Sequence, residues 1–187
     1  MRHKLLSALE GEPVVPALKD EQTLLRCQRC SCPVIFVLCG DILSIGQLID
    51  RLHAAGKKAV VHADLVNGLA AREVAVDFLH RCGADGIIST RPHLVRRARE
   101  LGLLAVLRVF AIDSKAVGNL RSETDACSPD MVEVLPGAIP HVIERLKREL
   151  KVPLIAGGLL ETKQDVMTAL KAGALCVSTS DSALWEI

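Results

Sequence analysis

Two glycines and three hydroxyl residues near the end of the chain have the spacing of a phosphate-binding site. Gly157 and Gly158 close one short apolar segment, and Ser178, Thr179 and Ser180 close the next one. Glycine leaves backbone N–H groups open to close approach, and hydroxyl groups can donate hydrogen bonds to an anion. In (β/α)8 barrels, the loops after the seventh and eighth strands often bind phosphate in this way. The two segments therefore predict a phosphorylated ligand. They also predict that they are themselves the seventh and eighth strands of a barrel.

Other features of these segments bear on the same site. Tight packing alone could require the glycine pair, in which case it says nothing about a ligand. Ser180, Asp181 and Ser182 could cap a short final helix over residues 183–186, and the N-terminus of that helix would point at an anion.

Charged and polar residues also stand at the carboxyl ends of other predicted strands, where barrel proteins bind their ligands. A buried charge needs a partner, so these residues predict either a paired network or contacts to a polar ligand. Arg108 and Glu133 lie on adjacent predicted strands and could equally form a structural ion pair. His62 could be a core histidine, and Asp41 and Asp64 could cap a turn or a helix. The candidate ligand contacts are Asp41, His62, Asp64, Arg108 and Glu133.

The elements that would position these residues are short apolar segments that alternate with amphipathic helical patterns. Most of the segments are apolar on both faces, which is typical of parallel strands covered by helices. They predict one α/β domain over residues 1–187, a small closed (β/α)8 TIM-like barrel with a single parallel sheet, outer helices and a core over about residues 13–185. The alternative, an open doubly wound sheet, would need a glycine-rich turn after an early strand, and no G-x-G-x-x-G is present. The predicted strands are 14–18, 34–38, 59–62, 86–90, 104–110, 131–135, 154–157 and 175–179.

The weakest helical pattern lies between the fifth and sixth predicted strands. It covers residues 113–125 and is interrupted by Gly118 and Asn119, both of which are poor helix formers. Of the predicted helices, this one has the weakest support.

The composition is that of a globular domain with an aliphatic core. Hydrophobic residues make up 50% of the chain and aromatic residues only 2%, which argues against a single-strand binder built on stacked aromatic rings. The net charge of +1 means that any nucleic-acid surface has to be a local patch. We expect no secretory signal and no membrane span. Seven scattered cysteines fit reduced thiols and a cytoplasmic location.

No clear catalytic centre is visible in the sequence. Lys57 and Lys58 enter the third predicted strand at its amino end, so a Schiff-base lysine is missing from the carboxyl ends. We therefore expect no catalytic residue, cofactor or bound metal, although the acidic residues at the strand ends could hold a divalent cation or transfer protons. Cys27, Cys30 and Cys32 could start a metal site, but a fourth ligand is not evident, and a helix end with a loop that carries thiols explains them as well.

Positive charge is concentrated in two predicted helices. In the first, Arg91, Arg96, Arg97 and Arg99 accompany apolar residues that would face the barrel, which leaves the arginines outward. Such runs are usually solvated helix faces. These four residues are also the candidate RNA contacts, and contacts to RNA phosphate groups would provide most of the affinity. The second run mixes basic and acidic residues and contains Glu144, Lys147, Arg148, Glu149 and Lys151.

Six ordered motifs resemble the glycerol-3-phosphate responsive antiterminators, which are bacterial regulators of glycerol uptake operons. The resemblance extends over nearly the whole chain, from about residue 13 to residue 185. The motifs are residues 62–69 (HADLVNGL), 86–91 (GIISTR), 108–114 (RVFAIDS), 129–137 (PDMVEVLPG), 155–158 (IAGG) and 177–180 (VSTS).

The resemblance implies a cytosolic (β/α)8 protein that senses glycerol 3-phosphate and binds leader mRNA, which prevents premature transcription termination. The glycine pair and the hydroxyl residues 178–180 would hold the phosphate, and His62, Asp64, Arg108 and Glu133 would surround the glycerol hydroxyl groups. The chain departs from the family pattern in places. Ala63 replaces a bulkier aliphatic residue, which could widen the mouth of the barrel and alter the choice of ligand. Arg72 stands where the family tends to have an acidic residue, and the cysteine cluster is not a family feature.

We therefore expect a ligand-responsive, RNA-binding antiterminator without catalytic turnover, with glycerol 3-phosphate and leader mRNA as its partners, and the question of a homo-oligomer stays open. One alternative is a barrel enzyme of the phosphodiesterase or isomerase type that acts on a small phosphorylated metabolite. In that enzyme Asp64 or Glu133 would be the acid or base, with His62 assisting. Another alternative is a relative that kept the ligand pocket but regulates through a protein partner.

Overall fold

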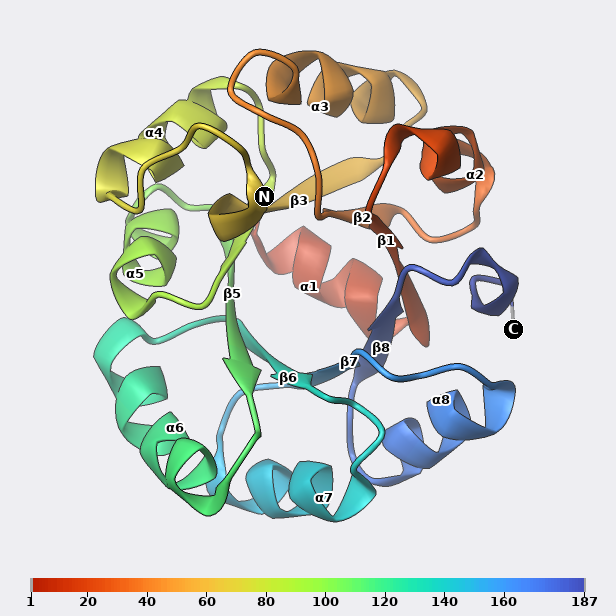
Figure 1. The fold of residues 1–187 in the computed structure, drawn as a ribbon, viewed down its shortest axis with the longest axis vertical. Helices are drawn as coiled ribbons and strands as arrows, with labels where there is room; N and C mark the ends of the chain where they lie inside the picture. Colours follow the sequence, from red (N-terminus) through yellow and green to blue (C-terminus); the bar gives the residue numbers. More distant parts are fainter. Residues whose placement is uncertain (1, 187) are drawn as a thin grey trace.

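The computed structural model describes residues 2–186 and shows parallel strands that close into a barrel inside a ring of helices (Figure 1). Neighbouring strands pair in sequence order, and β1 pairs with β8 to close the sheet. This topology confirms the predicted (β/α)8 barrel and rules out the open sheet. The strands are β1 (Val14–Leu18), β2 (Val34–Val37), β3 (Lys58–His62), β4 (Gly86–Ser89), β5 (Leu104–Phe110), β6 (Met131–Leu135), β7 (Leu154–Gly157) and β8 (Cys176–Thr179).

The predicted strands agree with the observed ones to within a residue at either end. Their side chains are almost all buried, because one face of each strand fills the barrel interior and the other lies under a helix. The helices are α1 (Arg2–Glu10), α2 (Leu24–Arg29), α3 (Ile45–Ala54), α4 (Glu73–Arg81), α5 (Pro92–Glu100), α6 (Ser114–Cys127), α7 (Pro140–Glu149) and α8 (Lys163–Lys171), with short 3-10 helices η1 (Glu21–Thr23), η2 (Ala63–Leu65) and η3 (Ser182–Leu184).

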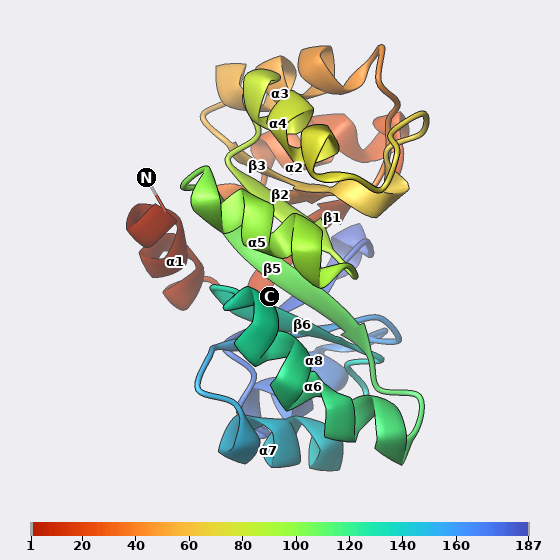
Figure 2. The ribbon, with the colours of Figure 1, turned by 90° about the vertical axis from the view of Figure 1, so that its left-hand side faces the viewer.

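Helix α1 precedes the barrel and covers its amino end. Leu5 and Leu9 are buried, and the helix lies beside Val34 and Lys58, where β2 and β3 begin. Figure 2 shows α1 outside one end of the barrel, away from the ring of outer helices. The opposite end, where the strands finish, is therefore the open end of the barrel.

The helix with the weakest pattern, over residues 113–125, is present as the 14-residue helix α6, because Val117 and Leu120 are buried against the barrel and Gly118 lies in open space. The possible final helix over residues 183–186 is instead the single 3-10 turn η3, in which Ala183 N donates to the Asp181 carboxylate. Among residues 2–186, no helix combines the length and the apolar character needed to cross a bilayer.

Candidate functional site

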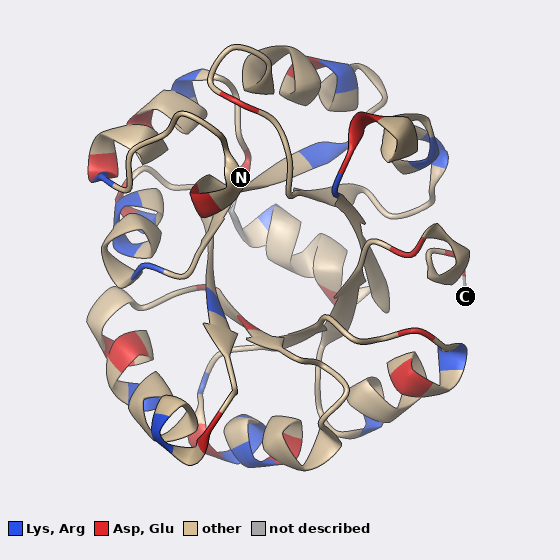
Figure 3. Ribbon diagram, in the orientation of Figure 1, with Lys and Arg blue, Asp and Glu red and all other residues tan. Residues whose placement is uncertain are grey.

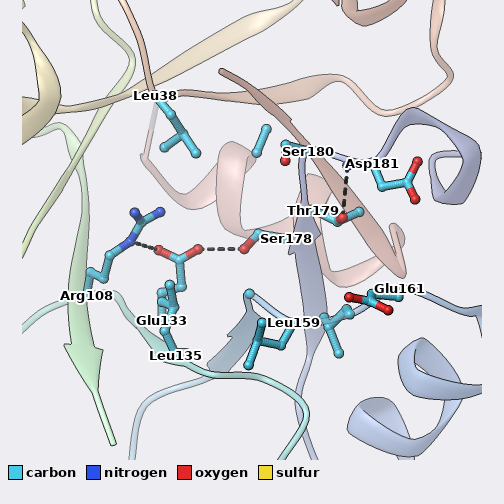
Figure 4. Close-up of a pocket in the computed structure, with 13 residues that line it drawn as sticks. Leu38, Arg108, Glu133, Leu135, Leu159, Glu161, Ser178, Thr179, Ser180 and Asp181 are labelled. Atoms are coloured by element: carbon cyan, nitrogen blue, oxygen red, sulfur yellow. Dashed lines mark hydrogen bonds and ion pairs between the residues drawn. The ribbon is translucent and has the colours of Figure 1, made fainter. Parts of the chain in front are cut away.

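A cavity of about 300 Å³ opens where β5, β6, β7 and β8 end (Figure 4). It brings together Gly158, Ser178, Thr179 and Ser180, four of the five predicted phosphate ligands, with Arg108 and Glu133 from the predicted ligand contacts. The remaining lining residues were not predicted from the sequence. They are Ala17, Leu38, Leu135, Leu159, Leu160, Glu161 and Asp181.

Arg108, Glu133 and Ser178 form a buried network across the floor of this cavity. Arg108 and Glu133 are paired in register on β5 and β6, and Arg108 Nε donates to Glu133 Oε2 over 2.6 Å. Ser178 Oγ on β8 donates to Glu133 Oε1 over 2.5 Å. The predicted ion pair is therefore present, and Arg108 and Ser178 together occupy both oxygens of Glu133, a residue that is 0% exposed. In this state the Ser178 hydroxyl hydrogen is directed to Glu133 and not to the cavity.

The guanidinium of Arg108 keeps unused hydrogen-bonding capacity. Among residues 2–186, neither of its terminal nitrogens has a hydrogen-bond partner, although the side chain is only about 9% exposed. Figure 4 shows both nitrogens pointing away from Glu133, on the side of Leu38. A largely buried cation with free donors is a strong recognition element for phosphate, because its charge is poorly screened by water.

The two glycines of the predicted cradle have different roles. A Cβ at Gly157 would lie 2.7 Å from Ser178 Oγ and 2.9 Å from Glu133 Oε1, so this position is glycine to make room for the buried network. Gly158 lines the cavity and has a φ of +74°, a left-handed conformation that favours glycine. Gly137 N donates to the carbonyl oxygens of both glycines and so holds the turn in place. The packing interpretation therefore applies to Gly157, and Gly158 remains a candidate ligand residue.

Two hydrogen bonds to Thr179 fix the conformation of the chain at the end of β8. Thr179 Oγ1 accepts from Asp181 N over 3.1 Å, and the Thr179 carbonyl accepts from the buried indole of Trp185 over 2.9 Å. In the part of the chain that the structure describes, the backbone N–H groups of Gly158 and Ser180 have no acceptor. Both residues line the same cavity, and unpaired backbone N–H groups of this kind can bind an anion.

Two carboxylates at the rim oppose the binding of an anion. Glu161 and Asp181 line the cavity but are exposed, so water and salt screen their charge more than that of the buried Arg108. Sequence reasoning missed Glu161 because it follows the glycine turn by only three residues and carries no pattern of its own.

His62 and Asp64 form a second cluster outside this cavity. Asp64 accepts from Ser89 Oγ, from Thr90 N and from Thr90 Oγ1 at 2.7–2.9 Å, and the Arg91 guanidinium lies 3.6 Å away. Burial would raise the pKa of Asp64, but the donors of Thr90 and Ser89 outweigh it and hold the pKa below its usual value. Asp64 therefore links the ends of β3 and β4. This structural role is close to the expectation that Asp64 caps a turn or a helix.

His62 is 2% exposed, and its Nδ1 has no hydrogen-bond partner in the described part of the chain. Its nearest carboxylate oxygen, Asp64 Oδ2, is 4.0 Å from Nδ1. Burial, reinforced by the positive charge of Arg108, lowers the pKa of His62 to about 4. His62 is therefore neutral at physiological pH, as expected of a core histidine.

Asp41 lies further from the cavity and shapes a turn. Its carboxylate accepts from the N–H groups of Leu43 and Ser44 at 2.8 and 2.9 Å, and the residue bridges to Asn67. These bonds lower the pKa of Asp41 below its usual value. The structure thus supports the turn interpretation of Asp41 and gives it no place in the cavity lining.

The arginines of α5, the predicted RNA contacts, are each close to a carboxylate. Arg96 contacts Glu73 at 3.2 Å, Arg97 contacts Asp77 at 2.6 Å and Arg99 contacts Asp130 at 3.1 Å. Arg91 lies at the start of α5, beside Asp64. The four residues therefore lie in ion pairs toward α4, β6 and the barrel mouth and do not form a free cationic face.

The cysteine cluster lies in the core at the end of α2. Cys30 Sγ donates to the Cys27 carbonyl and Cys32 Sγ to the Val34 carbonyl. Burial raises the pKa of Cys27 and of Cys32 to about 12, which keeps both as thiols, whereas a metal ligand has to be a thiolate. These contacts fit a helix end and loop that carry thiols.

Comparisons with known proteins agree with this architecture. A glycerol uptake operon antiterminator regulatory protein from Listeria monocytogenes is 35% identical, with a TM-score of 0.89 over 92% of this chain and 94% of that one. A glycerol uptake operon antiterminator-related protein from Thermotoga maritima is 36% identical, with a TM-score of 0.84 over 94% and 99% of the two chains. An Escherichia coli protein, the uncharacterized protein YgcP, is 35% identical over 98% of this chain and 96% of its own length.

The family model described as glycerol-3-phosphate responsive antiterminator matches residues 14–185, which is nearly the whole barrel. More distant barrels, such as an aldolase that is 12% identical with a TM-score of 0.71, share the fold alone. The chain belongs to the glycerol-3-phosphate responsive antiterminator family.

Proposed function

We propose that this protein binds glycerol 3-phosphate in the cavity at the ends of β5–β8 and, in response, binds leader mRNA in the cytoplasm to prevent premature transcription termination. Membership of the antiterminator family supports the regulatory role. The observation that carries the ligand assignment is the buried Arg108, whose terminal nitrogens are free inside a cavity that also holds unpaired backbone N–H groups.

The chemistry of the cavity matches a small phosphorylated polyol. Its volume of about 300 Å³ is at the lower end of the range for ligand pockets, which suits a three-carbon metabolite. Gly158 N, Ser180 N and the Ser180 hydroxyl would donate to phosphate oxygens, and Arg108 would supply the opposing charge. Thr179 Oγ1 can still donate its hydrogen, while Leu38 and Leu135 would contact the carbon chain.

The same contacts favour sensing over catalysis. Both oxygens of Glu133 and both oxygens of Asp64 accept hydrogen bonds from the protein itself, so each carboxylate already has a structural role. These are the two residues that the enzyme alternative needs as acid or base. We therefore propose a regulatory protein and not a phosphodiesterase or isomerase.

Isothermal titration calorimetry tests the ligand assignment. The double variant R108Q/E133Q replaces the ion pair with a neutral pair that can still form hydrogen bonds, so the fold is kept while the charge is lost. Charge-assisted hydrogen bonds contribute about 1.5–3 kcal/mol, so we expect the variant to bind glycerol 3-phosphate roughly 10- to 100-fold more weakly than the wild type. Equal binding of glycerol and glycerol 3-phosphate by the wild type would contradict the proposal.

A gel shift tests the second part of the proposal. A labelled RNA hairpin followed by a uridine tract, the form of an intrinsic terminator, is incubated with the protein with and without glycerol 3-phosphate. The proposal predicts RNA binding whose strength changes when the ligand is added, because linkage requires one ligand to alter the affinity for the other. The proposal would be contradicted if the protein bound no RNA, or if its RNA affinity did not change on addition of glycerol 3-phosphate.

A further inference from the structure

We infer that the RNA-binding surface lies at the amino end of the barrel, on the side of α6 and α7, and not on the arginines of α5. The surface consists of Arg121, Lys147, Arg148 and Lys151, which we call the α6–α7 basic cluster. The inference rests on the proposed function, because it assigns a place to the RNA partner proposed there.

The α5 arginines are poorly suited to binding a phosphate backbone. Arg96, Arg97 and Arg99 are each within 2.6–3.2 Å of a carboxylate oxygen. A neighbouring carboxylate repels a phosphate nearly as strongly as the arginine attracts it, so the pair presents almost no net charge. Arg97 has a second carboxylate partner, Glu100, at 2.9 Å. RNA would have to displace these partners and would gain little from the exchange.

The α6–α7 basic cluster differs because its charges are free. Among residues 2–186, none of its four members forms a salt bridge, and all four are exposed. Lys147 and Arg148 occupy the last turn of α7, and Lys151 precedes β7. Figure 3 shows basic residues on both α6 and α7, at neighbouring positions around the barrel.

A groove of about 330 Å³ connects the two helices and includes part of the cluster. Arg121 from α6 and Lys151 from the loop before β7 line it, together with Thr124 and Ser128. Arg99 of α5 also lines it, but its guanidinium is paired with Asp130 at 3.1 Å. Asp125 and Glu149 line it too, but Glu149 accepts a hydrogen bond from Arg145 over 2.8 Å, so its charge is largely compensated. Arg121 and Lys151 supply hydrogen-bond donors that could contact a phosphate of an RNA backbone.

The ligand end of the barrel carries exposed charges of both signs. Its loops present carboxylates, among them Asp113, Glu161 and Asp181, and lysines, among them Lys19, Lys115 and Lys163. The basic residues there are interspersed with acidic ones and form no cluster like the one on α6 and α7. The two ligands would therefore occupy opposite ends of the barrel and bind at the same time, without direct competition for one site.

The salt dependence of RNA binding gives the size of the effect. A single-stranded RNA releases counterions with a slope of about −0.7 in log K against log [salt] for each phosphate contact, so four contacts account for a slope of about −3. Neutralising the cluster should remove most of this slope and weaken binding by more than tenfold at moderate salt.

The test compares two variants that lose the same three positive charges. The first, the cluster variant, is R121Q/K147Q/K151Q, and the matched control is R91Q/R96Q/R97Q, which leaves Arg99 in place because it lines the groove. The probe is the labelled hairpin with its uridine tract, measured by fluorescence anisotropy at several salt concentrations, and calorimetry with glycerol 3-phosphate shows that each variant still folds and binds its ligand.

We expect the cluster variant to lose more than tenfold in RNA affinity and most of the salt slope, with glycerol 3-phosphate binding unchanged. The control should lose much less RNA affinity. If the control abolishes RNA binding and the cluster variant keeps it, this inference is overturned. The proposed function would still stand. A wild-type protein that binds glycerol 3-phosphate but no RNA would instead refute the RNA part of the proposed function.

Discussion

Replacing Glu133 with glutamine tests whether the buried network is poised to receive an anion. The substitution keeps the shape of the side chain and both hydrogen-bonding positions, so Arg108 Nε and Ser178 Oγ can each retain a partner. It removes only the negative charge. Arg108, which is 8% exposed, is then left without the carboxylate that compensates it.

The expected loss of stability follows from this uncompensated charge. Removing one partner of a buried ion pair typically destabilises a protein by about 3–5 kcal/mol, and the lower end applies here because the terminal nitrogens of Arg108 face a cavity that water can enter. For a domain of this size, about 3 kcal/mol corresponds to a fall of roughly 6–12 °C in Tm. A phosphate ligand supplies the missing charge, so glycerol 3-phosphate should raise the Tm of the variant more than that of the wild type.

Differential scanning fluorimetry with and without glycerol 3-phosphate measures both effects. The control is Ser178→Ala, which removes a donor to the same carboxylate but leaves both charges in place, and which should lower stability by about 1 kcal/mol without increasing the response to the ligand. A Glu133→Gln variant as stable as the wild type, or one with the same ligand-induced shift, would refute the reasoning.

Three further predictions concern residues around the network. Gly157→Ala places a Cβ 2.7 Å from Ser178 Oγ and should destabilise the protein by about 1–3 kcal/mol in urea unfolding; an unchanged midpoint would show that the network has room to shift. Glu161→Gln removes a rim carboxylate and should tighten glycerol 3-phosphate binding by a few fold in low salt but not in high salt; equal affinities in low salt would mean that this charge is too distant to act. His62 has a pKa of about 4 in the folded protein against about 6.5 when unfolded, so the unfolded state takes up more protons between these values and stability falls as the pH is lowered through this window. From pH 7 to pH 5 this contributes about 2 kcal/mol, which His62→Gln should abolish; an identical pH dependence in both proteins would contradict the buried neutral ring.

The barrel could be predicted from the sequence because its strands are apolar on both faces and its helices on one. That periodicity is a local property, and it located every strand to within a residue at either end. The helix α6 had the weakest pattern because intrinsic propensity counts Gly118 against a helix, while the burial of Val117 and Leu120 stabilises it in the folded protein. The helix α1 was missed because its role depends on contacts with the amino ends of distant strands.

The candidate site was predictable only in part. Polar residues at strand ends stand out in a sequence that is otherwise apolar there, which identified Arg108, Glu133 and Ser178. The sequence could not show which of two adjacent glycines faces the cavity, because that depends on the turn held by Gly137. Nor could it show that the arginines of α5 are paired, because their carboxylate partners lie on other elements and meet them only through the packing of the barrel.

The central claim is that the cavity at the ends of β5–β8 binds glycerol 3-phosphate through Arg108 and the loops after β7 and β8. A crystal structure of the protein with glycerol 3-phosphate tests it most directly. The phosphate should lie against the N–H groups of Gly158 and Ser180, with a terminal nitrogen of Arg108 contacting the ligand. A ligand bound beside His62 and Asp64 instead, or an empty cavity at saturating ligand, would contradict it.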